Sequence, residues 1–317
     1  MDFKACNVHL RSIDLDDDSY RISTGDDVDD LVLSISTAGL IAPPLLMESS
    51  EKFKIICGFR RIKACMELGW SKIDCRLMDA AVTSFECTQL AIADNSMQRK
   101  LNLLETSRAL NLLANCFNND EQLLQAAKTL NLPDNITALN KIKEICLLPR
   151  EIQENVLQEN ISLVVALSLG KMESNAGIAL AGLFTNLKAS LNKQREIVTL
   201  ITEISLREAI SVQDLINTPV VREIVNHPDM DRNLKTAKIR FYLKQRRYPA
   251  LCNAEKKFKK NLKLLKLESG INLIPPPNFE GQYYTLKLSF KNLSELAGRR
   301  KALDQIMDNP ALKKILQ

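Results

Sequence analysis

The chain has 317 residues, of which 45% are hydrophobic and 26% are charged, and its formal net charge is +5. This balance is typical of folded globular proteins and excludes a chain that is disordered throughout. The length predicts two or three domains, each large enough to bury a core of its own.

Composition also argues against several classes of protein. Met1–Arg11 mixes acidic and basic side chains, so no secretory signal is predicted, and the longest uncharged segment, 31–47, is broken by Gly39, Pro43 and Pro44. The cysteines form no Cys-x-x-Cys pair and only two histidines are present, so we expect reduced thiols and no structural zinc. A cytoplasmic protein without membrane contact is predicted.

The amino-terminal third predicts a small α/β domain. Residues 1–30 are acidic and polar, so the first predicted element is a helix through Val28–Ile35, capped by Asp26 or Asp27 and ended by Gly39. Further along the chain we expect strands at 45–48 and 53–57, a helix at 60–68 and a strand at 73–78. We assign this domain to residues 1–100.

The junction of the second strand with the second helix has the features of an anion site. Gly58 ends the strand, and Arg60 and Arg61 begin the helix. Free backbone N–H groups and the positive end of the helix dipole would then lie beside two guanidinium groups.

Amphipathic helical patterns dominate from Ser84 onward and predict a helical domain over residues 101–219. The two helices on either side of Leu132-Pro133-Asp134 resemble a helix-turn-helix near residues 121–148. Helices are predicted at 85–93, 104–116, 121–130, 136–147, 152–157, 163–169, 178–187, 194–204 and 212–216.

Positive charge is concentrated in residues 221–317, which carry 21 basic and 9 acidic side chains. Within it, Arg232–Lys266 has thirteen Lys or Arg against the single acid Glu255. We predict a basic helical arm over 220–274 that binds a polyanion, with a solvated helix face or anionic lipid as alternatives. The predicted DNA contacts on this arm are Lys244, Arg246, Arg247, Lys256, Lys257, Lys259 and Lys260.

The last segment, 275–317, is predicted to be a small β-α dimerisation module. Pro275–Pro277 end the helix, Tyr283–Phe290 alternates as a strand, and Leu293–Ile306 returns to helical spacing. One strand and one helix cannot bury themselves alone, so two copies should pair strand to strand and helix to helix. The predicted fold class of the whole chain is α+β.

Common catalytic signatures are missing from the sequence. Neither G-x-G-x-x-G, nor G-x-x-x-x-G-K-[ST], nor G-x-S-x-G can be written at any position. The sequence therefore does not predict an ordinary dinucleotide enzyme, a P-loop ATPase or an α/β-hydrolase.

Three segments in register carry a family resemblance. They are S-I-x-x-x-G-L-x-x-P at 34–43, Cys57-Gly58-Phe59-Arg60-Arg61, and Asp94-Asn95-Ser96-Met97-Gln98-Arg99. Together they resemble the ParB/Spo0J family of chromosome- and plasmid-partition proteins over about residues 10–170. The resemblance implies a dimeric DNA clamp whose amino-terminal domain binds CTP with Mg²⁺.

The resemblance also assigns site residues. It implies that nucleotide is bound by Gly39, Leu40, Gly58, Arg60, Arg61, Asp94, Asn95, Gln98 and Arg99, with Asp94 or Asn95 near the metal. Phe59 stands where the family usually has Glu, and Asp94 replaces a longer Glu, so hydrolysis of CTP is left open. Pairing of Arg60 and Arg61 with the acidic amino-terminal segment is the structural alternative.

The resemblance extends to DNA reading by the predicted helix-turn-helix, with a purely structural helix pair as the alternative. The side chains available for this role are Lys128, Thr137, Asn140, Lys141 and Lys143.

The predicted function is a CTP-gated DNA clamp in chromosome or plasmid segregation, associated with the nucleoid. It would bind a centromere-like site and non-specific duplex as a homodimer and contact a ParA-type ATPase. The alternatives are a ParB-fold transcription or nucleoid-associated regulator, and a sulfiredoxin-like or small-molecule kinase enzyme. Sulfiredoxin needs a G-C-H-R loop, whereas Phe59 occupies the Cys position here and Cys57 precedes the glycine.

Overall fold

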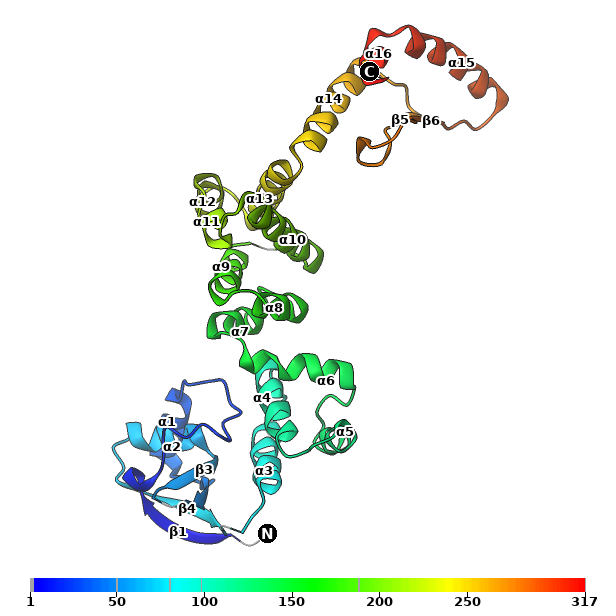
Figure 1. Ribbon diagram of the computed structural model, residues 1–317. Coiled ribbons are helices and arrows are strands. Elements are labelled where there is room, and N and C mark those ends of the chain that lie inside the picture. Colours follow the sequence, from blue (N-terminus) through cyan, green and yellow to red (C-terminus); the bar gives the residue numbers. More distant parts are fainter. Residues whose placement is uncertain (1–2, 50, 80, 98, 188, 317) are drawn as a thin grey trace. The chain divides into compact units, whose positions relative to one another are not determined.

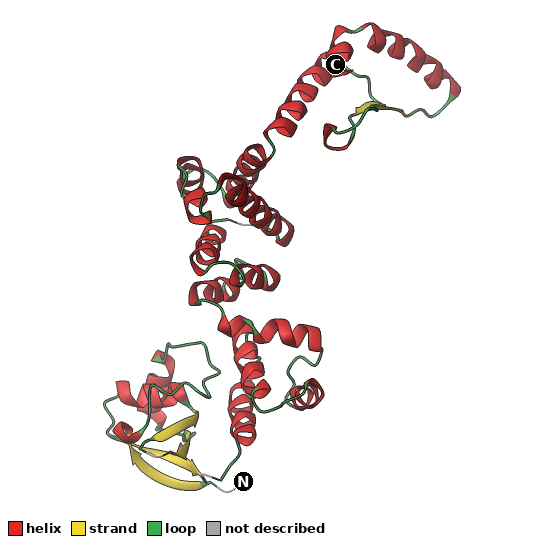
Figure 2. Cartoon of the chain, in the orientation of Figure 1, coloured by secondary structure: helices red, strands yellow, loops and turns green. Residues whose placement is uncertain are grey.

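The computed structural model describes residues 3–49, 51–79, 81–97, 99–187 and 189–316, which form an α+β protein (Figures 1 and 2). The predicted fold class is thereby confirmed. The chain divides into two compact units, residues 1–194 and 195–317, with the boundary in the first turn of α10 (Leu191–Glu208). None of the described helices is both long enough and apolar enough to cross a membrane.

A four-stranded sheet opens the first unit, with strands in the order β1-β4-β2-β3. Its strands are β1 (Lys4–His9), β2 (Leu45–Glu48), β3 (Phe53–Cys57) and β4 (Lys72–Met78). β1 pairs antiparallel with β4, while β2 pairs antiparallel with β3 and parallel with β4. The three predicted strands are confirmed. β1 was not predicted, because it lies in a polar segment and buries only Val8.

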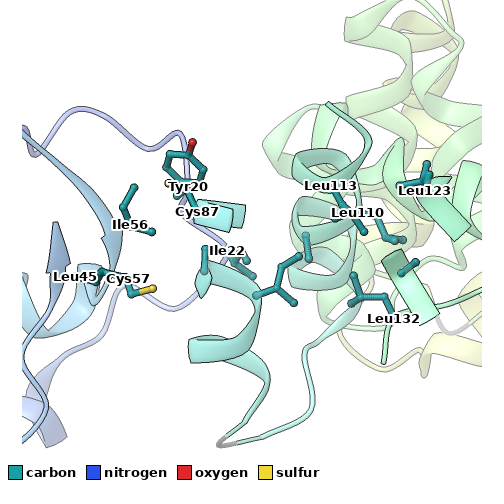
Figure 3. Close-up of a cluster of buried hydrophobic side chains, with 14 of the residues drawn as sticks. Tyr20, Ile22, Leu45, Ile56, Cys57, Cys87, Leu110, Leu113, Leu123 and Leu132 are labelled. Carbon is teal, nitrogen blue, oxygen red and sulfur yellow. The ribbon is translucent and has the colours of Figure 1, made fainter. Parts of the chain in front are cut away.

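The sheet is covered on both faces because successive side chains of a strand point to opposite sides. On one face, Leu46 and Ile55 share a core with α1 (Asp29–Ala38) and α2 (Phe59–Glu67). On the other face, Leu45 and Ile56 join a cluster that continues through Leu110 into the helices (Figure 3).

The start of α1 differs from the prediction. Val28, rather than Asp26 or Asp27, is the residue before the first turn, but the Asp27 carboxylate accepts from the N–H of Asp29, the first residue of the helix, at 3.0 Å. Asp29 and Asp30 instead lie within the first turn, where carboxylates interact favourably with the helix dipole.

Four helices follow β4, of which α3 packs on the second face of the sheet, α4 packs on α3, and α5 and α6 pack on α4. They are α3 (Ser84–Ser96), α4 (Leu103–Ala114), α5 (Asp120–Thr129) and α6 (Ile136–Lys143). Their buried residues share one cluster with the strands, so the predicted domain boundary near residue 100 falls within a continuous core (Figure 3). The division into four domains stays a prediction.

The helix predicted at 136–147 ends earlier, at Lys143, and a 3-10 turn follows at Ile145–Leu147. One reason is that the Cys146 N–H donates to the Ser107 hydroxyl at 2.9 Å instead of to a helix carbonyl. The first unit then continues through α7 (Arg150–Leu157), α8 (Leu163–Gly170) and α9 (Ser174–Thr185).

The second unit contains the basic arm as two helices. α13 (Arg232–Arg247) ends at Arg247, and after Tyr248 the helix α14 (Pro249–Leu265) begins at a proline, which needs no N–H partner in a first helical turn. α11 (Val212–Ile216) and α12 (Pro219–Asn226) precede them.

The carboxy-terminal segment has a strand pair within one chain. β5 (Ile271–Ile274) pairs antiparallel with β6 (Thr285–Leu288), and α15 (Leu293–Asp308) and α16 (Pro310–Leu316) follow. β5 was missed because it lies in the segment assigned to the basic arm. The predicted strand therefore does not need a second copy of the chain for its pairing, because β6 has a partner in its own chain. Dimerisation stays a prediction.

Candidate functional site

A cavity of about 490 Å³ opens in the first unit where three predicted segments meet. Its walls include residues 39–42, the start of α2, and the end of α3 with the residues that follow. It is lined by eight of the residues predicted to bind nucleotide: Gly39, Leu40, Gly58, Arg60, Arg61, Asp94, Asn95 and Arg99. Gln98, the ninth, lies outside the described residues.

The amino-terminal end of α2 supplies backbone donors to this cavity. Gly58 precedes the helix with φ +97°, and no side chain caps it. The Ile62 N–H donates to the Gly58 carbonyl at 3.0 Å, which is the first bond of the helix, so the N–H groups of residues 59–61 lack an acceptor within it. Such a helix end attracts anions.

Gly58→Ala is expected to destabilise the protein more than Gly69→Ala. Both glycines have positive φ, which costs an L residue roughly 1–2 kcal/mol. Only at Gly58 would the added Cβ also meet another atom closely, the Cβ of Pro44 at 2.8 Å. Urea unfolding gives the loss of unfolding free energy for each variant: Gly69→Ala reports backbone strain alone, and Gly58→Ala reports strain together with the contact to Pro44. Equal losses in the two variants would contradict a close contact with Pro44.

Arg61 joins three walls of the cavity. Its Nη1 donates to the Ala42 carbonyl at 2.9 Å, and its Nη2 donates to the two carboxylate oxygens of Asp94 at 2.9 and 2.7 Å. The Arg61 side chain is 17% exposed and that of Asp94 is 33% exposed. Both residues were predicted from the sequence to bind nucleotide, but their pairing with each other was not predicted.

Arg60 is held by backbone. Its Nη2 donates to the Asp27 carbonyl at 2.6 Å, and Lys63 Nζ donates to the Asp26 carbonyl at the same distance. The Nε of Arg60 is buried without a partner in the described part of the chain. The alternative that both arginines pair with the acidic amino-terminal segment is met only in part: Arg60 contacts a backbone carbonyl of that segment, whereas Arg61 pairs with Asp94 of α3. A buried donor without an acceptor is costly, so an anion or water beside Arg60 would lower the energy.

Asp94 and Asn95 supply oxygen atoms of the type that Mg²⁺ prefers. Asn95 Nδ2 donates to the Ala91 carbonyl at 2.8 Å, which orients its side-chain oxygen as an acceptor. Among the described residues, no group of three or more His, Cys, Asp or Glu could hold a metal ion. The oxygens of Asp94 and Asn95 therefore fit a Mg²⁺ ion that takes further oxygen ligands from a bound phosphate.

Arg99 directs its guanidinium to a carboxylate that the sequence analysis did not single out. Its Nη1 and Nη2 donate to the two oxygens of Glu105, both at 2.6 Å, and Glu105 is fully buried. Glu105 also accepts from the N–H groups of Thr24 at 3.2 Å and Asn102 at 3.0 Å. Burial raises the pKa of Glu105, but these hydrogen bonds outweigh it and hold the pKa below its usual value. The Asn102-x-x-Glu105 capping box is the signal that could have identified this residue.

Arg99→Ala is expected to lower the free energy of unfolding by about 2–3 kcal/mol at neutral pH, since it leaves a buried carboxylate without its cation. The depressed pKa of Glu105 contributes stability above the unfolded-state pKa, and this contribution is lost as pH falls through the folded-state pKa. The difference between variant and parent should therefore shrink in acid.

Urea unfolding at pH 7 and pH 4 measures this difference. Arg150→Ala is the matched control, because Arg150 pairs with Glu154 while 84% exposed and should cost less than about 1 kcal/mol. A loss for Arg99→Ala that is as small as the control, or independent of pH, would contradict the buried pair.

Cys57 borders this region but is unsuited to thiolate chemistry. It is 6% exposed, and burial, with a smaller contribution from Asp94, raises its pKa to about 12. Reactive cysteines have depressed pKa values. The structure therefore gives no support to a sulfiredoxin-like reaction at Cys57.

The predicted helix-turn-helix residues fall into two groups. Lys128, Thr137 and Lys141 are exposed on α5 and α6, whereas Asn140 and Lys143 are half-buried. The side-chain oxygen of Asn140 is buried without a partner in the described part of the chain. The exposed group could face DNA, and the helix-turn-helix stays a prediction.

The basic arm is partly neutralised by α10. Arg246 pairs with Glu208 and Arg247 with Glu203, each at 2.6 Å, while Lys244 pairs with Glu255 at 3.1 Å. The sequence did not predict these pairs, because two of the acids lie about 40 positions earlier in the chain.

The lysines of α14 differ from this group. Lys256, Lys257, Lys259 and Lys260 are exposed, and no ion pair is found for them among the described residues. Lys256, Lys259 and Lys260 share one side of the helix by their i, i+3 and i+4 spacing, while Phe258 packs against the carboxy-terminal core. α14 therefore carries a group of exposed lysines, with no ion pair among the described residues, that can meet a polyanion together.

The matches to a family model and to known relatives agree with each other. Residues 8–96 match the model of the ParB N-terminal domain. A nucleoid occlusion protein of Bacillus cereus is 30% identical over 136 residues, which cover 43% of this chain and 45% of that protein. A nucleoid occlusion protein of Geobacillus sp. is 31% identical over 136 residues, covering 43% of this chain and 46% of that protein. The chain thus spans less than half the length of these relatives.

Two solved structures are also similar. Both are of the C-terminally truncated chromosome-partitioning protein ParB from Caulobacter crescentus. The form complexed with CTP-gamma-S is 19% identical, with a TM-score of 0.27 and coverage of 57% of this chain and 99% of that one. The form complexed to the centromeric parS site is 16% identical, with a TM-score of 0.33 and coverage of 60% and 96%.

Proposed function

Because this chain belongs to the ParB family, with a ParB N-terminal domain at residues 8–96, we propose that it is a CTP-binding, DNA-binding partition protein. Nucleoid occlusion, the role named for its relatives, is the second candidate. In both cases we propose that the protein acts on the nucleoid in the cytoplasm as a homodimeric clamp. Contact with a ParA-type ATPase belongs to the partition role.

One observation carries the proposal. Eight residues from three separated segments line a single cavity that combines a helix amino terminus with two arginines. Backbone N–H groups and guanidinium forks are the donors that phosphate oxygens accept from. A triphosphate in this cavity would also give the unpartnered Nε side of Arg60 an anionic neighbour.

In the proposed site, the Asp94 carboxylate competes with a bound phosphate for Arg61. Phosphate oxygens and the Asp94 carboxylate would seek the same Nη2 donor of Arg61. When phosphate takes Arg61, the Asp94 oxygens are released and can serve a divalent cation together with Asn95. Bound Mg²⁺ would neutralise the charge between Asp94 and the triphosphate. Hydrolysis is not part of this proposal.

The nucleotide test compares CTP, GTP, ATP and UTP binding to the full chain with Mg²⁺, with and without genomic DNA fragments. We expect CTP to bind best. Arg60→Ala should weaken binding by about tenfold to a hundredfold, because one hydrogen bond to a charged group contributes about 1.5–3 kcal/mol. Equal affinity of parent and variant would remove Arg60 from the site.

The DNA part of the proposal assigns non-specific contacts to the lysine face of α14 and specific reading to α5 and α6. Side chains that neutralise phosphates supply affinity but carry no sequence information. Lys128, Thr137 and Lys141 are the exposed candidates for the specific contacts.

A further inference from the structure

Two cysteines lie opposite each other across β1 and β4. Cys6 and Cys75 are register partners in this antiparallel pair, and their Sγ atoms are 3.1 Å apart. This is the single contact between two thiols found among the described residues. Both side chains point to the sheet face that packs against α1 and α2.

The backbone geometry permits a covalent bond between them. Opposed residues of antiparallel strands have Cα atoms about 4.5–5.5 Å apart, which lies within the range of about 4.4–6.8 Å for disulfides. The sulfur atoms need to approach by only about 1 Å to reach bonding distance.

The two thiols differ in access. Cys75 is 2% exposed, and burial, together with its hydrogen bond to Cys6, raises its pKa to about 12. Cys6 is half-buried on β1, an edge strand whose one partner in the sheet is β4. An oxidant arriving from solvent therefore meets Cys6 first.

We propose that Cys6 and Cys75 form an oxidative modification site that a hydroperoxide converts to a disulfide. The Cys6 sulfur, as thiolate, attacks the peroxide, so that an S–O bond forms, the O–O bond breaks and one water or alcohol leaves. The Cys75 sulfur then attacks the Cys6 sulfur and loses its proton, so that the S–S bond forms, the S–O bond breaks and a water leaves. Two thiols are oxidised by two electrons, and the hydroperoxide is reduced.

The disulfide would link the edge strand β1 covalently to β4 and close a loop of the chain that contains α1, β2, β3 and α2. This loop includes residues 39–42 and 58–61 of the cavity, but neither cysteine lines the cavity. A crosslink of this length constrains the unfolded chain, so the midpoint of thermal unfolding should rise by roughly 5–15 °C.

The test treats the full chain with hydrogen peroxide, blocks remaining thiols with iodoacetamide and analyses the peptides by mass spectrometry. We expect a linked peptide pair containing Cys6 and Cys75, a higher unfolding midpoint and reversal of both by dithiothreitol. Cys252→Ser, a half-buried cysteine of the second unit, should behave as the parent does.

Cys6→Ser should give no linked pair and no rise in midpoint. The proposal is overturned if Cys6 and Cys75 of the oxidised parent are both recovered as alkylated thiols. It is equally overturned if Cys6 is found as a sulfinic acid with Cys75 free. The peptide analysis of the parent decides the matter even if Cys6→Ser folds poorly.

Discussion

Replacing Lys256, Lys257, Lys259 and Lys260 by glutamine is expected to weaken non-specific duplex binding by about three orders of magnitude at about 0.1 M salt. Each lysine that neutralises a phosphate releases condensed counterions, which adds about 0.9 to the slope of log affinity against log salt. The four side chains are exposed on α14, and no acidic partner in the described chain competes for them. The slope should therefore fall by up to about 3.6.

The matched control changes the same charge elsewhere in the second unit. Lys291, Lys301, Lys313 and Lys314 are also exposed and lie outside α14. Their replacement by glutamine removes the same net charge, so a general effect of charge would appear in both variants. Fluorescence anisotropy with a labelled duplex at several salt concentrations measures the slopes. Equal slopes in the two variants would show that the α14 face is not the contact surface.

The distribution of free charge could not be predicted from the sequence, although the concentration of positive charge could. A basic run is local in the sequence, but Arg246 and Arg247 pair with Glu208 and Glu203 of α10, which only the folded unit brings close. The number of basic and acidic residues within Arg232–Lys266 therefore overestimates the charge available to DNA.

The segments that line the cavity were singled out from the sequence, but the contacts within it were not, and nucleotide binding by these residues stays a prediction. Gly58 and Arg60 were identified because a strand-glycine-helix junction has a defined backbone chemistry. The Arg61–Asp94 pair joins residues 33 positions apart, and no periodic pattern encodes such a contact. Glu105 carried a local signal, its capping box, but its burial against Arg99 depends on the packing of α4.

The strands show a similar division. β2, β3 and β4 were predicted because their apolar residues are buried on one or both faces of a sheet. β1 and β5 lie in or beside polar or basic sequence, so their pairing with β4 and β6 determines them more than their own residues do.

Arg61→Ala is expected to lower the affinity for CTP and Mg²⁺ by about a hundredfold or more, because it removes two donor groups from the cavity wall. Arg61 also joins residues 39–42 to α3 through Ala42 and Asp94. Isothermal titration calorimetry gives the affinity, and urea unfolding of the same variant reports any loss of structure. Binding equal to the parent in a folded variant would exclude Arg61 as a phosphate contact.

Asp94→Asn distinguishes competition for Arg61 from simple repulsion. Without Mg²⁺, the substitution should raise triphosphate affinity, both because a negative charge is lost and because Arg61 is released. In the Arg61→Ala background only the loss of negative charge remains, so the gain in triphosphate affinity should be smaller. The difference between the two gains, expressed as free energy, is the coupling energy of the pair.

With Mg²⁺ present, Asp94→Asn should instead weaken binding, since an amide is a poorer ligand than a carboxylate for a hard cation. Equal gains in both backgrounds would mean that Asp94 does not restrain Arg61. An unchanged affinity with Mg²⁺ would mean that Asp94 does not serve the metal.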